Sequence, residues 1–337
     1  MTKNIDLVNI ILICLSLALA YLIPFELFLF SYAFLGPLHY LTEINWLKEK
    51  RYFLPNPNYA VFFIVVAVAI SIPGLLKVPI WPGVLKITFI DYLGNYLSNY
   101  SSALILFSFL ISIAWVFFGD KDKRFYAILC FAFSIFLGLR FFPKGIFMMV
   151  IFVPTIIHVY IFTLLFMVFG ALKTANISSK IAIVLLVSVP VIISFSPIDG
   201  SSYLLGQEAQ DVFLASGFQG LGIKISEMMG ITKDKDYMLY ASNNVKIQIF
   251  IAFAYTYHYL NWFSKTSVIG WNRNMSVAKK SIILVIWAIS ILIYWYDYSL
   301  GMSLLFALSI LHVLLEFPLN VTSIRAIGIS LKRRENV

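Results

Sequence analysis

Charged side chains are scarce in this chain. Only 12% of its 337 residues are Asp, Glu, Lys or Arg, whereas 61% are hydrophobic and the mean hydropathy is +0.90. A soluble domain carries roughly 25% charged residues. Long runs nearly free of charge recur along the whole chain, and the short alternating segments typical of barrel strands do not. The sequence therefore predicts an all-α, polytopic transmembrane helical bundle that forms a single integral membrane domain over residues 1–337.

Cysteine and the common catalytic motifs are also scarce. The two cysteines, Cys14 and Cys130, each lie within an apolar run, which favours small buried hydrophobes over a disulfide or a metal pair. No Walker A, GxSxG, HExxH or CxxC pattern occurs, so the sequence indicates no nucleotide-binding element. The net charge of +9 comes from short basic clusters between apolar runs. Such clusters set membrane topology, so we expect the lipid bilayer as a partner and no nucleic acid.

The apolar runs predict about ten spanning helices, within a range of 8–10, because a span takes roughly 17–25 residues. They cover residues 7–23, 25–46, 58–77, 101–118, 124–142, 145–171, 180–196, 246–263, 278–297 and 299–321. Residues 80–99 are too short and mixed to span and predict an interfacial or re-entrant segment. The first run loosely imitates a secretory signal, but hydrophobicity resumes at Tyr21, which favours a retained helix.

The distribution of basic residues predicts the orientation. With the N-terminus in the cytoplasm, most of the 25 lysines and arginines fall in cytoplasmic segments. We therefore expect a protein of the cell (inner) membrane with both termini cytoplasmic. The longest connection, residues 197–245, then lies outside the membrane, either as a plain folded loop or as a lid over a lipid-accessible cavity.

All four histidines of the chain fall within predicted spans. They are His39, His158, His258 and His312. Their helices are the second, sixth, eighth and tenth, which run in one direction, so the four imidazoles can converge in one bundle. Neutral imidazole is a ligand for Fe, Zn, Cu and Ni. The pattern leads to the hypothesis of a shared metal site, against the alternative that each histidine forms an ordinary interhelical hydrogen bond.

Two carboxylates accompany the histidines. Glu43 follows His39 by four residues and Glu316 follows His312 by four, so each pair shares one helix face. Metal-bound histidines usually donate their second N–H to a carboxylate or carbonyl, so these acids are candidates to orient the two rings or, alternatively, to bind the metal directly. The spacing provides no such acid for His158 or His258.

Aromatic residues surround His258. Tyr257, Tyr259 and Trp262 can line a path for a long apolar substrate, although helix packing explains them equally well.

The stretches "GPLHYLTE" and "LHVLLE" resemble the Brp/Blh family of membrane β-carotene 15,15′-dioxygenases. The family's first motif is Gly-x-Pro-His, and here Gly36-Pro37-Leu38-His39 has the proline and the variable residue exchanged. His39 with Glu43 and His312 with Glu316 match the family pattern best. The chain departs from it at Trp262, where the family tends to have a second histidine, and at His158, which lacks the following acid.

The resemblance implies a helical bundle whose intramembrane histidines bind one Fe(II). It further implies a non-haem iron oxygenase that uses O₂ and acts on a carotenoid or another lipid-soluble substrate. Three other hypotheses stay open: a membrane zinc hydrolase, a proton-coupled transporter whose His–Glu pairs relay protons, and a structural membrane protein.

Overall fold

The computed structural model describes residues 2–76, 88–174, 176–232, 236–270, 272 and 275–335, and this part of the chain forms helices and no strand. The predicted all-α class is confirmed. Eight of its helices are long and apolar enough to cross a membrane. They cover residues 5–22, 57–76, 100–117, 121–141, 153–174, 177–195, 277–296 and 298–332, and each corresponds to a predicted span.

The two other predicted spans, 25–46 and 246–263, are also helical. The first comprises α2 (Pro24–Phe30), the π-helix η1 (Ser31–Leu35) and α3 (Gly36–Glu49), and the second is α12 (Ser242–Ser264). Both carry buried polar side chains, which lower their hydropathy below that of the other spans: Ser31, His39, Thr42, Glu43, Asn244, Gln248, Thr256, His258 and Asn261. These helices therefore have buried polar faces, and both carry a histidine of the candidate site.

The predicted interfacial or re-entrant segment at 80–99 falls partly outside the described residues, which resume at 88. Residues 88–99 form the first turns of α5 (Thr88–Phe117), which runs without a break into the predicted span at 101–118. This part of the segment is therefore an extension of the next helix and not a separate element.

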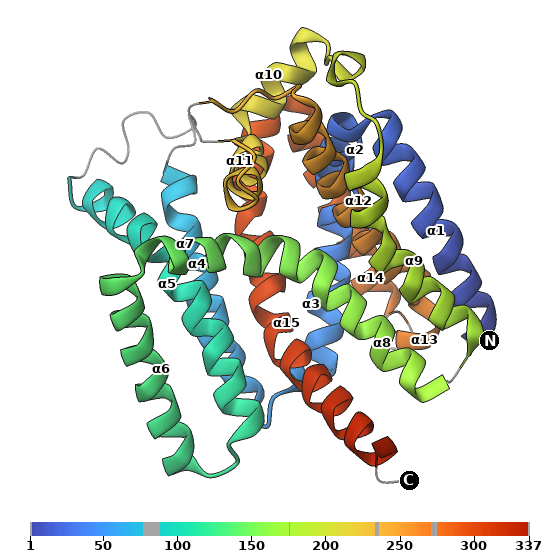
Figure 1. Cartoon of the computed structure of the whole chain (residues 1–337). Coiled ribbons are helices and arrows are strands. Elements are labelled where there is room, and N and C mark those ends of the chain that lie inside the picture. The colour runs from blue at the N-terminus through green and yellow to red at the C-terminus, as the bar shows by residue number, and fades with distance from the viewer. Residues whose placement is uncertain are drawn as a thin grey trace. The chain divides into compact units, whose positions relative to one another are not determined.

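The chain groups into two compact units, of which the first comprises Met1–His39 and Val159–Ser299. Its remaining long helices are α1 (Thr2–Leu22), α8 (Thr163–Thr174), α9 (Ile177–Phe195) and α14 (Val277–Tyr296), and a short α13 (Thr266–Ile269) follows α12. Figure 1 shows α1, α9 and α12 next to one another, in agreement with their mutual contacts. The side chains of α12 are buried along most of its length, so this helix is the core of the first unit.

The connection 197–245 belongs to the first unit and is folded where it is described. It contains the 3-10 helix η5 (Gly200–Tyr203), α10 (Gln207–Ala215) and α11 (Gln219–Met228). Aromatic rings attach it to α2: Phe213 lies 5.1 Å from Phe25 and Phe218 lies 4.7 Å from Phe28, measured between ring centroids. Its role as a lid stays a prediction.

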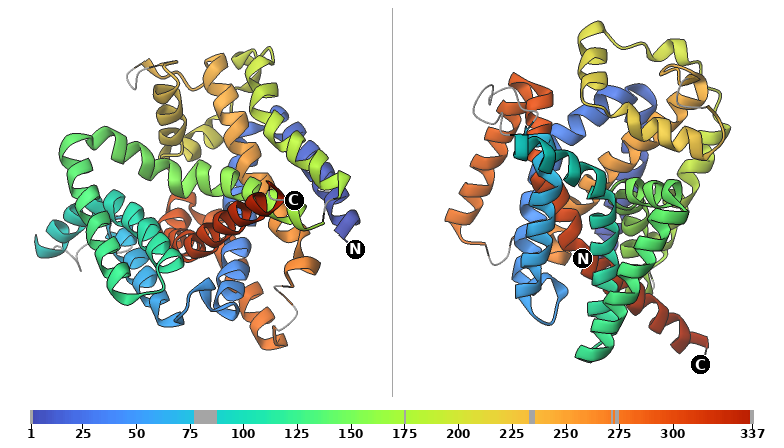
Figure 2. Two further views of the ribbon diagram at one scale, coloured as in Figure 1. Left: turned by 60° about the horizontal axis from the view of Figure 1, so that its bottom comes forward. Right: turned by 90° about the vertical axis from the view of Figure 1, so that its left-hand side faces the viewer.

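The second unit comprises Tyr40–His158 and Leu300–Val337. Besides most of α3 it contains the 3-10 helices η2 (Arg51–Phe53) and η3 (Pro57–Tyr59), then α4 (Ala60–Leu76), α5, α6 (Lys121–Phe141) and α7 (Pro143–Phe152). The π-helix η4 (Val153–Phe162) and α15 (Tyr298–Glu335) complete it, apart from their first or last residues. Contacts join α5 to α4, α6 and α7, and Figure 2 (right) shows α4, α5 and α6 alongside one another. The turn before α6 is fixed by Asp120, whose carboxylate accepts from the backbone N–H groups of Asp122 and Lys123.

Two π-helical segments precede or contain site residues. The first, η1, ends four residues before His39, and the second, η4, contains His158. A π-helix widens the turn and frees carbonyl groups from their usual partners. Two threonines donate to carbonyls four residues before them: Thr155, in η4, to Ile151 near the end of α7, and Thr163, at the start of α8, to Val159 in η4. Side-chain hydrogen bonds thus hold both ends of η4.

Candidate metal centre

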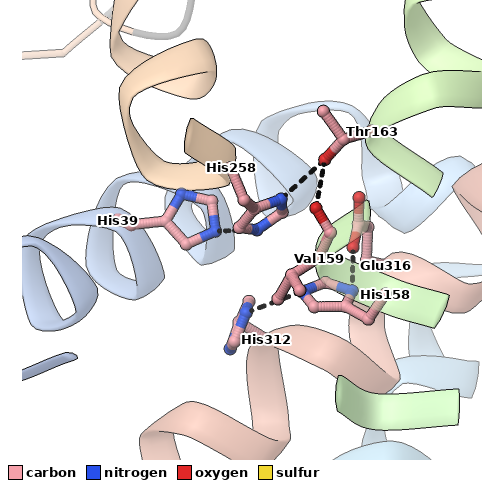
Figure 3. A network of polar contacts seen from close by, with 7 residues as sticks. All are labelled: His39, His158, Val159, Thr163, His258, His312 and Glu316. Carbon is pink, nitrogen blue, oxygen red and sulfur yellow. Dashed lines mark hydrogen bonds and ion pairs between the residues drawn. The ribbon is translucent and has the colours of Figure 1, made fainter. Parts of the chain in front are cut away.

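Two of the candidate ligands face each other within the first unit. His39 lies on α3 and His258 lies on α12, and their Nε2 atoms are 3.1 Å apart. Both side chains are buried, with 1% and 6% of their surface exposed. Figure 3 shows the two rings meeting through these nitrogens. The Nε2 atoms are therefore in position to bind a common ion.

The other nitrogen of His258 is held by a threonine. Its Nδ1 lies 2.8 Å from the Thr163 hydroxyl, and that hydroxyl lies 2.9 Å from the carbonyl oxygen of Val159. A hydroxyl has one hydrogen, and the carbonyl can only accept it. The threonine oxygen must therefore accept from Nδ1–H, which places the proton of His258 on Nδ1 and leaves a lone pair on Nε2. This is the tautomer that binds a metal through Nε2.

The other two candidate ligands face each other within the second unit. His158 lies on η4 and His312 on α15, and their Nε2 atoms are 3.2 Å apart. The ring of Tyr40 stacks on His312 with 4.2 Å between centroids and an interplanar angle of 22°. Stacking fixes the plane of the His312 ring.

Glu316 contacts His158. Its Oε2 lies 2.8 Å from His158 Nδ1, and both side chains are 2% exposed. A negative charge at this distance favours a proton on Nδ1, which would leave the lone pair on Nε2. The predicted partner of Glu316 was His312, so that assignment needs correction, and the acid that His158 lacks on its own helix is provided by α15. Helical spacing places Glu316 and His312 on one face, but the carboxylate reaches across to the neighbouring helix.

The four histidines together form a group that can hold a metal ion. All are buried, and one ring nitrogen of each lies within 4.8 Å of those of the others. Two imidazole nitrogens about 2.1 Å from one metal stand about 3.0–3.4 Å apart at angles of 90–109°. The 3.1 and 3.2 Å separations fit that geometry. The four imidazoles could therefore hold one ion, and the donor set suits Fe, Zn, Cu or Ni.

Glu43 is the second carboxylate near this group. It is buried, with 2% of its surface exposed, and lies one turn beyond His39 on α3. Glu43 and Glu316 are both buried carboxyl groups of the second unit. Carboxylates in a buried environment are stabilised by positive charge, and a divalent cation on the four neutral imidazoles would provide it.

The three predicted lining aromatics divide into two sets. Tyr259 and Trp262 contact His39, with ring centroids 5.1 and 5.6 Å away. Tyr257 points elsewhere: its hydroxyl lies 3.4 Å from Asn9 Oδ1 and 3.2 Å from Met167 Sδ, on α1 and α8. Tyr259 and Trp262 therefore form an apolar wall beside the histidines, whereas Tyr257 takes part in helix packing.

Thr163 and Tyr40 were missed by the sequence analysis. Thr163 is a polar residue in an apolar run, and Tyr40 directly follows His39. These signals mark both residues as candidates for a polar or aromatic contact. They do not say which histidine each contacts, because both partners lie on other helices.

Comparison of the chain with family models, with curated proteins and with solved structures finds no match. The function must therefore be argued from the site itself.

Proposed function

We propose that this protein is a membrane-embedded, histidine-ligated metalloenzyme, specifically a non-haem iron oxygenase that acts on a carotenoid or another lipid-soluble substrate. The observation that carries the proposal is the group of four buried imidazoles, whose ligand nitrogens lie within 4.8 Å of one another. The motif around His39, with its resemblance to the Brp/Blh dioxygenases, supports the choice of reaction and substrate class.

The number of histidines supports iron over zinc. Structural zinc is closed by four protein ligands, and catalytic zinc uses three protein ligands and a water. Four histidines around zinc would therefore leave no position for a reactant. Non-haem iron sites keep open positions beside their protein ligands, so iron held by the same four imidazoles would still accept a reactant. Iron bound here would provide the redox chemistry by which dioxygen oxidises an apolar substrate.

The chain's own residues have separate tasks in this proposal. His39, His158, His258 and His312 hold the ion. Thr163 and Glu316 keep protons on Nδ1 of His258 and His158, which directs both Nε2 lone pairs to the metal.

Two further kinds of side chain complete the surroundings. Glu43 and Glu316 offset the charge of the cation. Tyr259 and Trp262 provide an apolar surface that excludes water from the histidines.

Metal analysis of the purified protein tests the proposal directly. Protein prepared in detergent without oxygen and reconstituted with Fe(II) should hold a single iron per chain, and His39→Ala and His312→Ala should lose it. Lys121→Ala, an exposed residue at the start of α6, is the control and should keep it. Substoichiometric metal in the wild type, or unchanged metal in the two histidine variants, would contradict the proposal.

An activity measurement separates the oxygenase from the transporter hypothesis. Iron-loaded protein in lipid vesicles should consume dioxygen when a carotenoid is added and should form an oxidised product. Uptake of a solute driven by a proton gradient, in vesicles that bind no metal, would instead favour a proton-coupled transporter.

A further inference from the structure

Asn320 is a buried amide without a hydrogen-bond partner. It lies on α15 in the second unit, 1% of its surface is exposed, and neither its Oδ1 nor its Nδ2 has a partner. Asn244 in α12 is equally buried but fully bonded: its Oδ1 accepts from Ser226 Oγ at 3.1 Å, and its Nδ2 donates to the carbonyl of Met238 at 2.7 Å. The two asparagines are thus equally buried, and they differ only in whether their side chains are hydrogen-bonded.

An unbonded buried amide is unusual. Buried polar groups in folded proteins are hydrogen-bonded in the great majority of cases, and each exception calls for an explanation. A leucine of similar volume would fill the place without the unsatisfied donor and acceptor. Asn320 therefore has the character of a residue that is kept for binding at the expense of stability.

Asn320 also has a defined place relative to the candidate metal centre. It follows Glu316 by four residues and His312 by eight on α15, so all three lie on one face of the helix. At a rise of about 1.5 Å per residue, Asn320 stands about 12 Å along the axis from His312. A ligand that reaches from one to the other must be long.

We propose that Asn320 binds an oxygen at one end of the substrate, so that a carbon about 12 Å away along the molecule lies at the metal centre. The inference rests on the proposed function and deepens it, because it names the substrate class: a long, apolar, oxygenated terpenoid such as a hydroxy- or ketocarotenoid. A primary amide can donate to a ketone and can both donate to and accept from a hydroxyl, so it distinguishes either group from a hydrocarbon end.

Binding of a matched pair of carotenoids tests the inference. Zeaxanthin carries a ring hydroxyl at each end, whereas β-carotene has the same carbon skeleton without oxygen. The wild type should bind zeaxanthin at least about tenfold more tightly than β-carotene, because a site with buried polar groups rejects the ligand that leaves them unbonded. Asn320→Leu should reduce this preference to within about twofold by weakening zeaxanthin binding and not β-carotene binding.

Thermal stability distinguishes a binding role from a structural one. Without ligand, Asn320→Leu should melt at the same temperature as the wild type or higher, because no hydrogen bond is lost. Asn244→Leu is the matched control and should melt lower, because it removes an acceptor from Ser226 Oγ and the donor to the Met238 carbonyl. A lower melting temperature for Asn320→Leu with an unchanged zeaxanthin preference would overturn the inference. If that variant fails to fold, Asn320→Ala is measured in the same way.

The inference and the proposed function fail in different ways. Wild-type protein that binds iron and oxidises both carotenoids, with equal affinity for the two, would overturn the inference and leave the proposed function intact. Protein without iron would overturn the proposed function. In that case carotenoid quenching of tryptophan fluorescence still measures the two affinities, and a zeaxanthin preference that Asn320→Leu removes would support the Asn320 site alone.

Discussion

Proton placement on two histidines is the most specific chemical feature of the site. The Thr163 hydroxyl accepts from His258 Nδ1–H, and the Glu316 carboxylate lies 2.8 Å from His158 Nδ1, so one partner is neutral and the other charged. Charge-assisted hydrogen bonds are roughly twice as strong as neutral ones. We therefore expect the His158 ring to be oriented more firmly than the His258 ring.

Replacement of Thr163 by valine should weaken metal binding. Valine has the shape of threonine but cannot accept from His258 Nδ1–H, so the tautomer and the ring orientation are no longer fixed. We expect the iron affinity to fall about 10–100-fold, the usual effect of removing such a partner. Metal titration of the purified variants measures it, with Thr163→Ser as the control that keeps the hydroxyl. Equal affinities for the valine and serine variants would show that the hydroxyl has no such role.

The partner of Glu316 can be identified by double-mutant cycles. We expect Glu316→Gln and His158→Phe to be coupled by about 0.5–3 kcal/mol in the unfolding free energy of the metal-free protein, because the two side chains are in contact. The parallel cycle of Glu316→Gln with His312→Phe should give coupling no larger than about 0.5 kcal/mol. A larger coupling energy in the cycle with His312 than in the cycle with His158 would instead support the pair of Glu316 and His312 that the helical spacing predicted.

The residues that could be predicted are those whose type is rare in their surroundings. Four isolated imidazoles in apolar runs stand out in a sequence, and the structure brings all four together. The partner of Glu316 could not be predicted, because helical spacing describes only the face of its own helix. Thr163 could not be assigned either, since a threonine in a helix can bond its own backbone without any tertiary role.

Among the elements, η4 has the largest effect on the site. It holds His158 in a ten-residue π-helix that begins at Val153 and includes Pro154. Proline has no N–H for the regular helical bond and its ring crowds the preceding turn, which favours a local widening. An added residue in a helical turn rotates everything after it, so the π-helix sets the direction of the His158 ring.

Deletion of Ile157 should convert part of η4 to a regular helix and remove metal binding. Loss of one residue turns the following side chains by about 100° about the axis, so His158 would leave the site while the helix persists. Iron content and far-ultraviolet circular dichroism measure the two effects. Ile157→Ala keeps the length and should retain the iron. A deletion variant that binds iron as the wild type does would show that the π-helix does not position His158.

Helices were easier to predict than their irregularities. Hydropathy alone places the spans, because a membrane requires long apolar helices. It does not place η1 or η4, since π-helices depend on where carbonyl groups find partners. The end of α15 was also predicted too early, at residue 321. The helix continues to Glu335, because basic residues such as Arg325 and Lys332 suit a helix that leaves the hydrocarbon region.

At the scale of the whole molecule, the helices differ in how much of their surface is buried. In α6 and α14 only 6% and 11% of the apolar window is buried, whereas α12 is buried along most of its length. Exposed apolar helices fit contact with lipid, and buried polar helices fit the interior. The arrangement is consistent with a membrane domain that keeps its chemistry inside.

Cysteine labelling tests the predicted orientation in the membrane, with residue 201 outside the cell and residue 121 in the cytoplasm. In a chain with Cys14 and Cys130 replaced by alanine, Ser201→Cys in η5 should react with a membrane-impermeant maleimide in intact cells. Lys121→Cys should react only after the membrane is opened, because the basic segments lie in the cytoplasm. Labelling of Lys121→Cys in intact cells would reverse the orientation.

The order of the ligands along the chain has a consequence for biosynthesis. His39 precedes His312 by 273 residues, so it is synthesised long before the last of the four histidines. On the proposed function, three histidines wait in the membrane for the fourth, and the site can bind its ion only after the helix that carries His312 has been inserted. A nascent or truncated chain would hold imidazoles and carboxylates in lipid without the cation that stabilises them. Membrane quality control could recognise such a chain as incomplete.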